Sequence, residues 1–132
     1  MNIVLDTSAA FEIVLFRPER EKILEEISKA NIVLAPDLFY SEAGNVVWKM
    51  YRFEKKKLSD YELALHSVIN LIDEFHSSES LWEKAFQLAC ETELTVYDCI
   101  YLQLARESKA KLFSMDKKLN RKALEIGITV LF

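Results

Sequence analysis

Hydrophobic positions alternate along the chain between the short apolar runs of strands and the spacing of helices. Residues 2–5 form an apolar strand, and apolar side chains at helical spacing follow in 9–14. A second apolar helix face covers 23–27, and a second strand covers 32–35 and stops at Pro36. Strand, helices and strand in this order predict a parallel sheet with helical crossovers, and therefore an α/β fold.

The middle of the chain has only helical patterns. Residues 37–52 have helical periodicity, with Asp37 as the expected cap. Ser59 and Ser80 each stand three residues before a glutamate, which is the capping-box spacing, ahead of two further apolar stripes. We therefore expect an all-helical insertion after the second strand.

The last third of the chain returns to mixed patterns. Thr95 is the expected cap of a helix that continues to about residue 108, with Tyr97 and Tyr101 facing the core. A third strand is expected over 112–114, followed by a short helix and a final strand over 128–132.

Composition places the chain among folded proteins of one domain. Its 132 residues, 51% of them hydrophobic, suit a single unit over 1–132 with one real core. Cys90 and Cys99 lack the spacing of a zinc site or a disulfide scaffold, so both are expected to be buried free thiols. No run approaches the ~18 apolar residues of a membrane span, and Asp6 comes too early for a signal peptide. We therefore expect no membrane association and a cytoplasmic location.

The charge is acidic overall but uneven. A formal net charge of −4 argues against a protein that coats nucleic acid, because such proteins need many cations to displace counterions. Residues 109–122 nevertheless hold one acid, Asp116, among six basic residues: Lys109, Lys111, Lys117, Lys118, Arg121 and Lys122. A solvated helix face is the simplest interpretation of such a run, but this one surrounds a candidate catalytic acid.

Two acids follow strands of the expected sheet. Asp6 directly ends the first strand, and Asp116 lies two residues beyond the third. In a parallel sheet both project toward the carboxyl edge, where α/β proteins bind their ligands. Asp6 can equally serve only as the cap of the helix that it precedes.

Two more acids lie in apolar surroundings on helices. Glu42 shares one stripe of its helix with Phe39 and Val46, and an unpaired buried carboxylate there requires a cation, a basic partner or a raised pKa. A structural salt bridge is the alternative. Asp98 stands three residues after Thr95 among apolar neighbours, so it is either a capping-box partner or a second inward-facing acid.

Together the four acids predict a metal site. Carboxylates that crowd together repel one another unless a strong positive charge lies among them, and all-oxygen ligation suits Mg²⁺ or Mn²⁺. Zinc is disfavoured because His66 and His76 have no second ligand at suitable spacing. No nucleophile elbow and no glycine-rich phosphate loop occur. The predicted chemistry is metal-assisted hydrolysis of a phosphodiester.

Four segments of the chain resemble the PIN-domain family, in particular its VapC-type toxins of toxin–antitoxin pairs. The segments are Asp6-Thr7-Ser8, Ser41-Glu42, Val96-Tyr97-Asp98-Cys99-Ile100-Tyr101-Leu102 and Leu112-Phe113-Ser114-Met115-Asp116-Lys117-Lys118-Leu119. The resemblance covers essentially the whole chain, and its last two segments are the most specific.

The resemblance implies both a fold and an activity. The fold is a three-layer α/β/α sandwich with a mainly parallel sheet of four to five strands, and the activity is endonucleolytic cleavage of RNA with Mg²⁺ or Mn²⁺. Homodimers and a cognate antitoxin protein are implied as partners. By position, the catalytic, metal-binding acids are Asp6, Glu42, Asp98 and Asp116. The supporting hydroxyls are Thr7, Ser8 and Ser114, and location alone suggests Lys117, Lys118, Arg121 and Lys122 as RNA contacts.

Some features leave alternatives open. Residues 117–120 hold no acid where some family members carry a further one, so the number of metals is undecided. A receiver-like signalling domain also has strand-end aspartates around magnesium, but it needs an adjacent acid pair where this chain has Asp6 and Thr7. A catalytically silent module that binds RNA or protein through the same groove is the third hypothesis.

Overall fold

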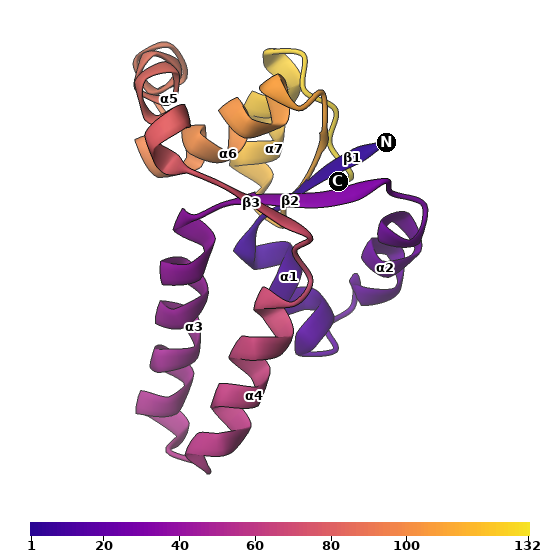
Figure 1. Ribbon diagram of the computed structural model, residues 1–132, viewed down its shortest axis with the longest axis vertical. Coiled ribbons are helices and arrows are strands. Elements are labelled where there is room, and N and C mark those ends of the chain that lie inside the picture. Colours follow the sequence, from indigo (N-terminus) through magenta and orange to yellow (C-terminus); the bar gives the residue numbers. More distant parts are fainter.

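A parallel sheet forms the centre of the fold. The computed structural model describes all 132 residues and contains four strands in the order β3-β2-β1-β4 (Figure 1). They are β1 (Asn2–Leu5), β2 (Ile32–Pro36), β3 (Glu74–His76) and β4 (Lys111–Phe113). Because β2 and β4 pair with opposite edges of β1, the chain changes direction across the sheet at β1. That change marks where a parallel sheet forms its ligand site.

Helices cover both faces of the sheet (Figure 1). One layer holds α1 (Thr7–Val14), α2 (Arg20–Ser28), α3 (Leu38–Glu54) and α4 (Leu58–Ile69), and the other holds α5 (Ser78–Thr92), α6 (Val96–Glu107) and α7 (Lys117–Glu125). Successive side chains of β1 point to opposite faces of the sheet. Ile3 and Leu5 pack in the core under the first layer, and Val4 packs in the core under the second. The expected three-layer α/β/α sandwich is confirmed.

Two strand predictions are wrong. Strand β3 lies inside the segment expected to be all helical, and it pairs with β2. Its three residues are too few to produce a periodic signal. The strand expected over 128–132 is reduced to one bridge between Leu112 and Val130, so the sheet has four strands.

The helix caps are confirmed only in part. Thr95 caps α6 as predicted, since its hydroxyl accepts a hydrogen bond from the Asp98 N–H at 3.1 Å. Asp37 makes no such bond to α3, and its carboxylate instead accepts from the first N–H of α5 at 3.0 Å. Ser59 and Ser80 lie inside their helices, because α4 and α5 begin earlier than the capping boxes predicted.

Two expectations about burial also fail. Cys99 is buried, but Cys90 is exposed, although both thiols are free as predicted. Tyr101 is buried, whereas Tyr97, in the first turn of α6, is 63% exposed. No helix of the chain is both long enough and apolar enough to span a bilayer.

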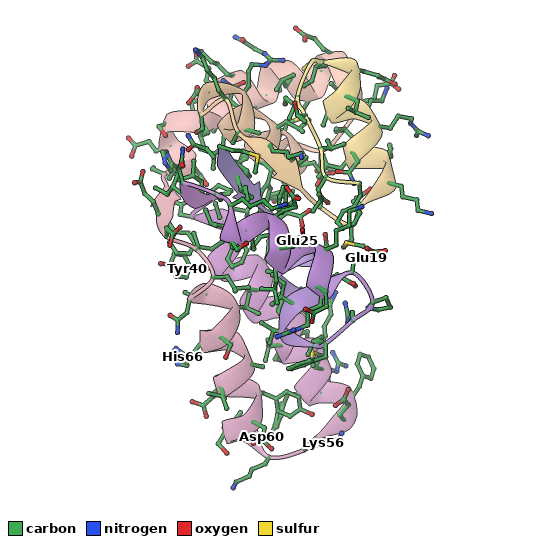
Figure 2. All side chains as sticks on the ribbon, turned by 90° about the vertical axis from the view of Figure 1, so that its right-hand side faces the viewer. Glu19, Glu25, Tyr40, Lys56, Asp60 and His66 are labelled. Atoms are coloured by element: carbon green, nitrogen blue, oxygen red, sulfur yellow. The ribbon has the colours of Figure 1, made fainter.

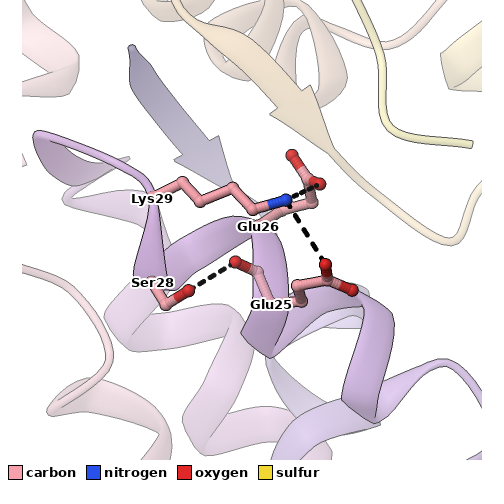
Figure 3. A network of polar contacts seen from close by, with 4 residues as sticks. All are labelled: Glu25, Glu26, Ser28 and Lys29. Carbon is pink, nitrogen blue, oxygen red and sulfur yellow. Dashed lines mark hydrogen bonds and ion pairs between the residues drawn. The ribbon is translucent and has the colours of Figure 1, made fainter.

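Most acidic residues have ordinary surface roles, as the end of α2 illustrates. Lys29 pairs with Glu25 at 3.4 Å and with Glu26 at 3.3 Å, and Ser28 donates to the Glu25 carbonyl (Figure 3). Such solvent-exposed pairs stabilise a fold by only about 0–1 kcal/mol. These carboxylates are satisfied by cations, unlike those described below.

The fold predicts a large stability effect at Leu102. This side chain is fully buried in the core between α6 and the sheet, so Leu102→Ala should lower the free energy of unfolding by about 2–5 kcal/mol in urea titrations. Leu63→Ala on α4, where the side chain is 67% exposed, is the control and should change it by less than about 0.5 kcal/mol. A loss below about 1 kcal/mol for Leu102→Ala would contradict the packing described.

Candidate active site

The two strand-end aspartates lie at the same edge of the sheet. Leu5 of β1 is in register with Phe113 of β4, and the Asp6 N–H donates to the Phe113 carbonyl at 3.0 Å. Asp116 follows β4 by three residues and begins α7. The sheet therefore brings Asp6 and Asp116 to one carboxyl edge, as the sequence predicted.

Asp6 caps α1 and is 7% exposed. Its Oδ1 accepts from the Ala9 N–H at 3.0 Å and from the Ser8 hydroxyl at 2.6 Å, whereas its Oδ2 accepts no hydrogen bond. Burial raises the pKa of Asp6, the charge on Asp116 raises it further, and the hydroxyls of Ser114 and Ser8 oppose the rise. The cap interpretation is thus correct, but it accounts for only one of the two oxygens.

Asp116 has the same arrangement at the start of α7. Its Oδ1 accepts from the Lys118 N–H at 3.0 Å and from the Leu119 N–H at 3.1 Å, and its Oδ2 is free of hydrogen bonds. The side chain is exposed. Asp6 and Asp116 are therefore both fixed by one oxygen and leave the other available.

Two serines connect the strand ends. The Ser8 Oγ accepts from the Met115 N–H at 2.9 Å, the Ser114 Oγ accepts from the Asp116 N–H at 3.0 Å, and the two hydroxyl oxygens lie 3.4 Å apart. Thr7, by contrast, is only the first residue of α1, and its hydroxyl makes no hydrogen bond. The structure therefore gives Ser8 and Ser114 a positioning role that Thr7 does not share.

Sequence reasoning missed the contribution of Asn120 to this edge. Asn120 is buried on α7, and its side-chain amide donates to the Ser114 carbonyl at 2.9 Å. Its place one helical turn after Asp116 is a weak signal that the residue faces the same edge.

Glu42 approaches the site from α3 and is bound by Tyr101 of α6. The fully buried side chains of α3 are Phe39, Ala43 and Val47, so Glu42 lies beside the core stripe, half-buried, rather than within it. Its Oε1 accepts from the Tyr101 hydroxyl at 2.5 Å. Burial raises the pKa of Glu42, and the nearby carboxylate charges raise it further.

Tyr101 is the residue whose hydrogen bond to Glu42 sequence reasoning missed, because that reasoning assigned Tyr101 only to the core. It is 3% exposed, and burial followed by the charge on Glu42 raises its pKa well above the ordinary range of tyrosine. The hydroxyl therefore stays protonated and donates to Glu42. The available signal was the tyrosine itself, because a buried phenol needs a hydrogen-bond partner that phenylalanine would not need.

Asp98 completes the set from the first turn of α6. Its carboxylate does not accept from the Thr95 N–H, so the capping-box alternative is not formed in full. Burial raises the pKa of Asp98, as does the charge on Asp116, while Thr95 and the Lys118 ammonium lower it. Asp98 is therefore within electrostatic reach of both α7 residues.

The four carboxylates make up one cluster of negative charge, which we call the acidic edge: Asp6, Glu42, Asp98 and Asp116. No ion pair of the structure includes any of them. The atoms that these side chains can offer to a metal are all oxygens. Each carboxylate has at least one oxygen that accepts no hydrogen bond. This donor set fits a hard divalent cation. As the side chains stand, no three of them are at the spacing of a metal cage.

The basic residues of α7 do not all face this cluster. Lys118 is close enough to affect the pKa of Asp98. Lys122 pairs with Glu125 at 3.3 Å, and Lys117 and Arg121 line a separate cavity of about 460 Å³ next to Met115. Of the four cations that location suggested, Lys118 is the one whose charge lowers the pKa of one of the acids.

Comparison with known proteins supports the fold described, and the matches cover nearly the whole chain. Ribonuclease VapC3 of Pyrobaculum aerophilum is 27% identical over 124 residues, which are 92% of this chain and 95% of that protein. The crystal structure of PAE2754 from Pyrobaculum aerophilum has a TM-score of 0.77 at 22% identity, and the match covers 99% of this chain and 84% of that one.

A second solved structure has the same fold. VapBC2 from Rickettsia felis, bound to a DNA fragment from their promoter, has a TM-score of 0.69 at 16% identity, covering 98% of this chain and 97% of that one. The family model of the PIN domain matches residues 3–125. With that match over nearly its full length, the chain belongs to the PIN domain family.

Proposed function

We propose that this protein is a metal-dependent endoribonuclease, and that it is the toxin of a toxin–antitoxin pair. The observation that carries the proposal is the acidic edge, because four carboxylates converge there with no basic partner. A ribonuclease is the named activity of the relative that is similar over 92% of the chain.

The acidic edge supplies the ligands for the proposed metal. Asp6, Glu42, Asp98 and Asp116 would hold Mg²⁺ or Mn²⁺ through their free oxygens, after small side-chain rotations that bring them closer than they stand. When bound, such an ion offsets the repulsion among the acids, lowers the pKa of a water and stabilises charge on the leaving oxygen of a phosphodiester.

The surrounding residues hold these acids in place. Tyr101 fixes one oxygen of Glu42, and Ser8 with the first turn of α1 fixes one oxygen of Asp6. Hydrogen bonds of this kind orient ligands and limit their motion. Lys118, near Asp98, is the best placed of the α7 cations to contact the RNA backbone, a contact that positions RNA without reading its sequence.

Protein partners are part of the proposal. The Rickettsia felis structure is a VapBC2 assembly, and we extend that to a cognate antitoxin for this chain. Large apolar side chains exposed on α3 and α4, among them Phe53 and Leu63, support a protein contact there. A homodimer remains an expectation from the resemblance, and a cytoplasmic site of action remains an expectation from the sequence.

The first functional prediction concerns Asp98. Asp98→Asn should reduce Mn²⁺-dependent cleavage of a mixed RNA pool by at least about 100-fold, since it removes a direct ligand charge. EDTA should abolish cleavage by the unaltered protein. Asp60→Asn is the matched control, because Asp60 is exposed at the tip of the α3–α4 projection (Figure 2). Unchanged cleavage by folded Asp98→Asn would contradict the mechanism, and RNA binding without cleavage by the unaltered protein would favour a silent module.

The second functional prediction concerns the hydrogen bond from Tyr101 to Glu42. Tyr101→Phe keeps the volume of the ring but frees Glu42, and it should reduce kcat by about 10- to 100-fold and weaken Mn²⁺ binding. Tyr51→Phe on α3 is the control, with no expected effect. If kcat and Mn²⁺ affinity are both unaltered in Tyr101→Phe, the hydroxyl has no positioning role.

The raised pKa values of Asp6, Glu42 and Asp98 predict how stability depends on pH in EDTA. The ordinary pKa is 3.8 for aspartate and 4.5 for glutamate, and the pKa values in the folded protein lie above these. At a pH between the ordinary and the raised pKa, the folded protein therefore binds more protons than the unfolded chain. These groups therefore destabilise the fold above their raised pKa, and the penalty is relieved as the pH falls through it.

Thermal unfolding with and without metal measures this effect. Lowering the pH from neutral toward the ordinary aspartate pKa of 3.8 should reduce the Tm difference between the unaltered protein and Asp98→Asn, the variant being the more stable of the two at the higher pH. Mn²⁺ should raise the Tm more at the higher pH, where the ligands are ionised. A Tm difference that grows as the pH falls would show that the sign is wrong.

A further inference from the structure

A small cavity opens beside the acidic edge. It has a volume of about 270 Å³, and its lining comes from α3 and from the first turn of α6: Leu38, Ser41, Glu42, Asn45 and Tyr97. Glu42 thus belongs both to the cavity and to the acidic edge, and Tyr97 precedes Asp98 in the chain. Whatever occupies this cavity lies next to the proposed reaction centre.

The lining is matched to a flat, polar-edged ligand. The ring of Tyr97 is 63% exposed, the highest value among the five tyrosines, and provides a free aromatic face. Ser41 and Asn45 are exposed, and neither their side chains nor the Tyr97 hydroxyl make a hydrogen bond within the protein. A hydroxyl and an amide with unused donors and acceptors therefore flank the aromatic ring.

The volume restricts the size of the occupant. Sites for drug-sized ligands measure about 300–1,000 Å³, so a cavity of about 270 Å³ suits a single ring system rather than a larger molecule. An aromatic face with amide and hydroxyl groups at its margin is how proteins hold an unpaired base, by stacking and by hydrogen bonds to its edge.

We propose that the cavity formed by Ser41, Asn45 and Tyr97 binds one unpaired nucleobase of the RNA, next to the phosphate that is cleaved. This inference rests on the proposed ribonuclease function and adds a preference for single strands. Tyr97 stacks on the base, and Asn45 and Ser41 contact its edge. A base inside a duplex is already stacked on both faces, so it cannot enter the cavity without being unpaired.

Cations along α3 provide a path for the backbone of that strand. Lys49 lies one helical turn beyond Asn45 on the same face of α3. The Arg52 guanidinium lies 5.4 Å from the centre of the exposed Trp48 ring, and neither Lys49 nor Arg52 takes part in an ion pair. Free cations next to an aromatic side chain are typical of surfaces that bind single-stranded nucleic acid.

Binding of a fluorescein-labelled, single-stranded RNA of mixed sequence tests the proposal. Fluorescence anisotropy is measured with Mn²⁺ in an Asp6→Asn background, whose amide oxygen can still cap α1. Adding Tyr97→Ala should raise the Kd about tenfold, the size expected when one stacked base is lost. Tyr97→Phe should stay within about twofold of the background, because stacking needs only the ring. The control is Phe86→Ala on α5, a side chain with similar exposure that lies outside the cavity, and its Kd should be unchanged.

Two further measurements separate this proposal from the proposed function. The same RNA annealed to its complement should bind without dependence on Tyr97. In the cleaving protein, Tyr97→Ala should raise KM about tenfold and leave kcat nearly constant, and Asn45→Ala should alter the base found at the cut sites. Failure of the unaltered protein to cleave any RNA, with Tyr97-dependent binding intact, would reject the nuclease but keep the base site.

Other outcomes would overturn the base site itself. One is cleavage of RNA by a Tyr97→Ala protein whose Kd, KM and cut sites match those of the unaltered protein. Another is an equal loss of single-stranded and duplex binding. A third is unchanged RNA binding together with a change in the oligomeric state of Tyr97→Ala, which would assign the exposed ring to a protein contact.

Discussion

Repulsion among four carboxylates is the constraint on which the rest of this structure depends. The charge on Asp116 raises the pKa of Asp6 and of Asp98, the charges on Asp6 and Asp98 raise the pKa of Glu42, and no ion pair includes any of the four. Apart from the two helix caps that Asp6 and Asp116 make, the crowding of these charges lowers the stability of the fold. Two ordered cores, one on each face of the sheet, offset the cost. A set of acids that offers only oxygens and has no basic partner is what a divalent-cation site requires, and such a site is what we propose here.

The same elements that hold the acids also limit what they can do. Asp6 and Asp116 each use one oxygen to cap a helix, and Glu42 uses one to accept from Tyr101. A capping oxygen is held by backbone N–H groups, so the carboxylate cannot rotate freely. The other oxygen of each of these three side chains accepts no hydrogen bond and stays available. The switch of chain direction at β1 brings Asp6 and Asp116 to one edge of the sheet, because β1 and β4 end side by side there.

The parts of the fold that sequence predicted were those with many residues in one pattern. Helices α3 and α6, and strands β1 and β2, repeat their apolar positions, but β3 has three residues and is defined only by its pairing with β2. The acids were predictable because an acid after a strand or in apolar company breaks the local pattern. Tyr101 was hidden because a buried tyrosine fits the core pattern equally well, and only its contact with Glu42 distinguishes it. Tyr97 was wrongly assigned to the core. Helical spacing shows which residues share one face of a helix, but it does not show how much of that face the neighbouring elements cover.

An acidic protein that acts on RNA has to obtain affinity without a broad positive surface. The net charge of −4 and the acidic edge both repel a polyanion. The cations of α7 do not form one patch, since Lys122 pairs with Glu125 whereas Lys117 and Arg121 line a separate cavity. Contacts that do not rely on charge are then worth more, because stacking on an aromatic ring is not screened by salt as phosphate contacts are. In the base site that we propose, the uncharged side chains of Ser41, Asn45 and Tyr97, beside Glu42, supply such a contact. Under these two proposals, the charge at the acidic edge serves the chemistry, and the uncharged groups beside it bind an unpaired base.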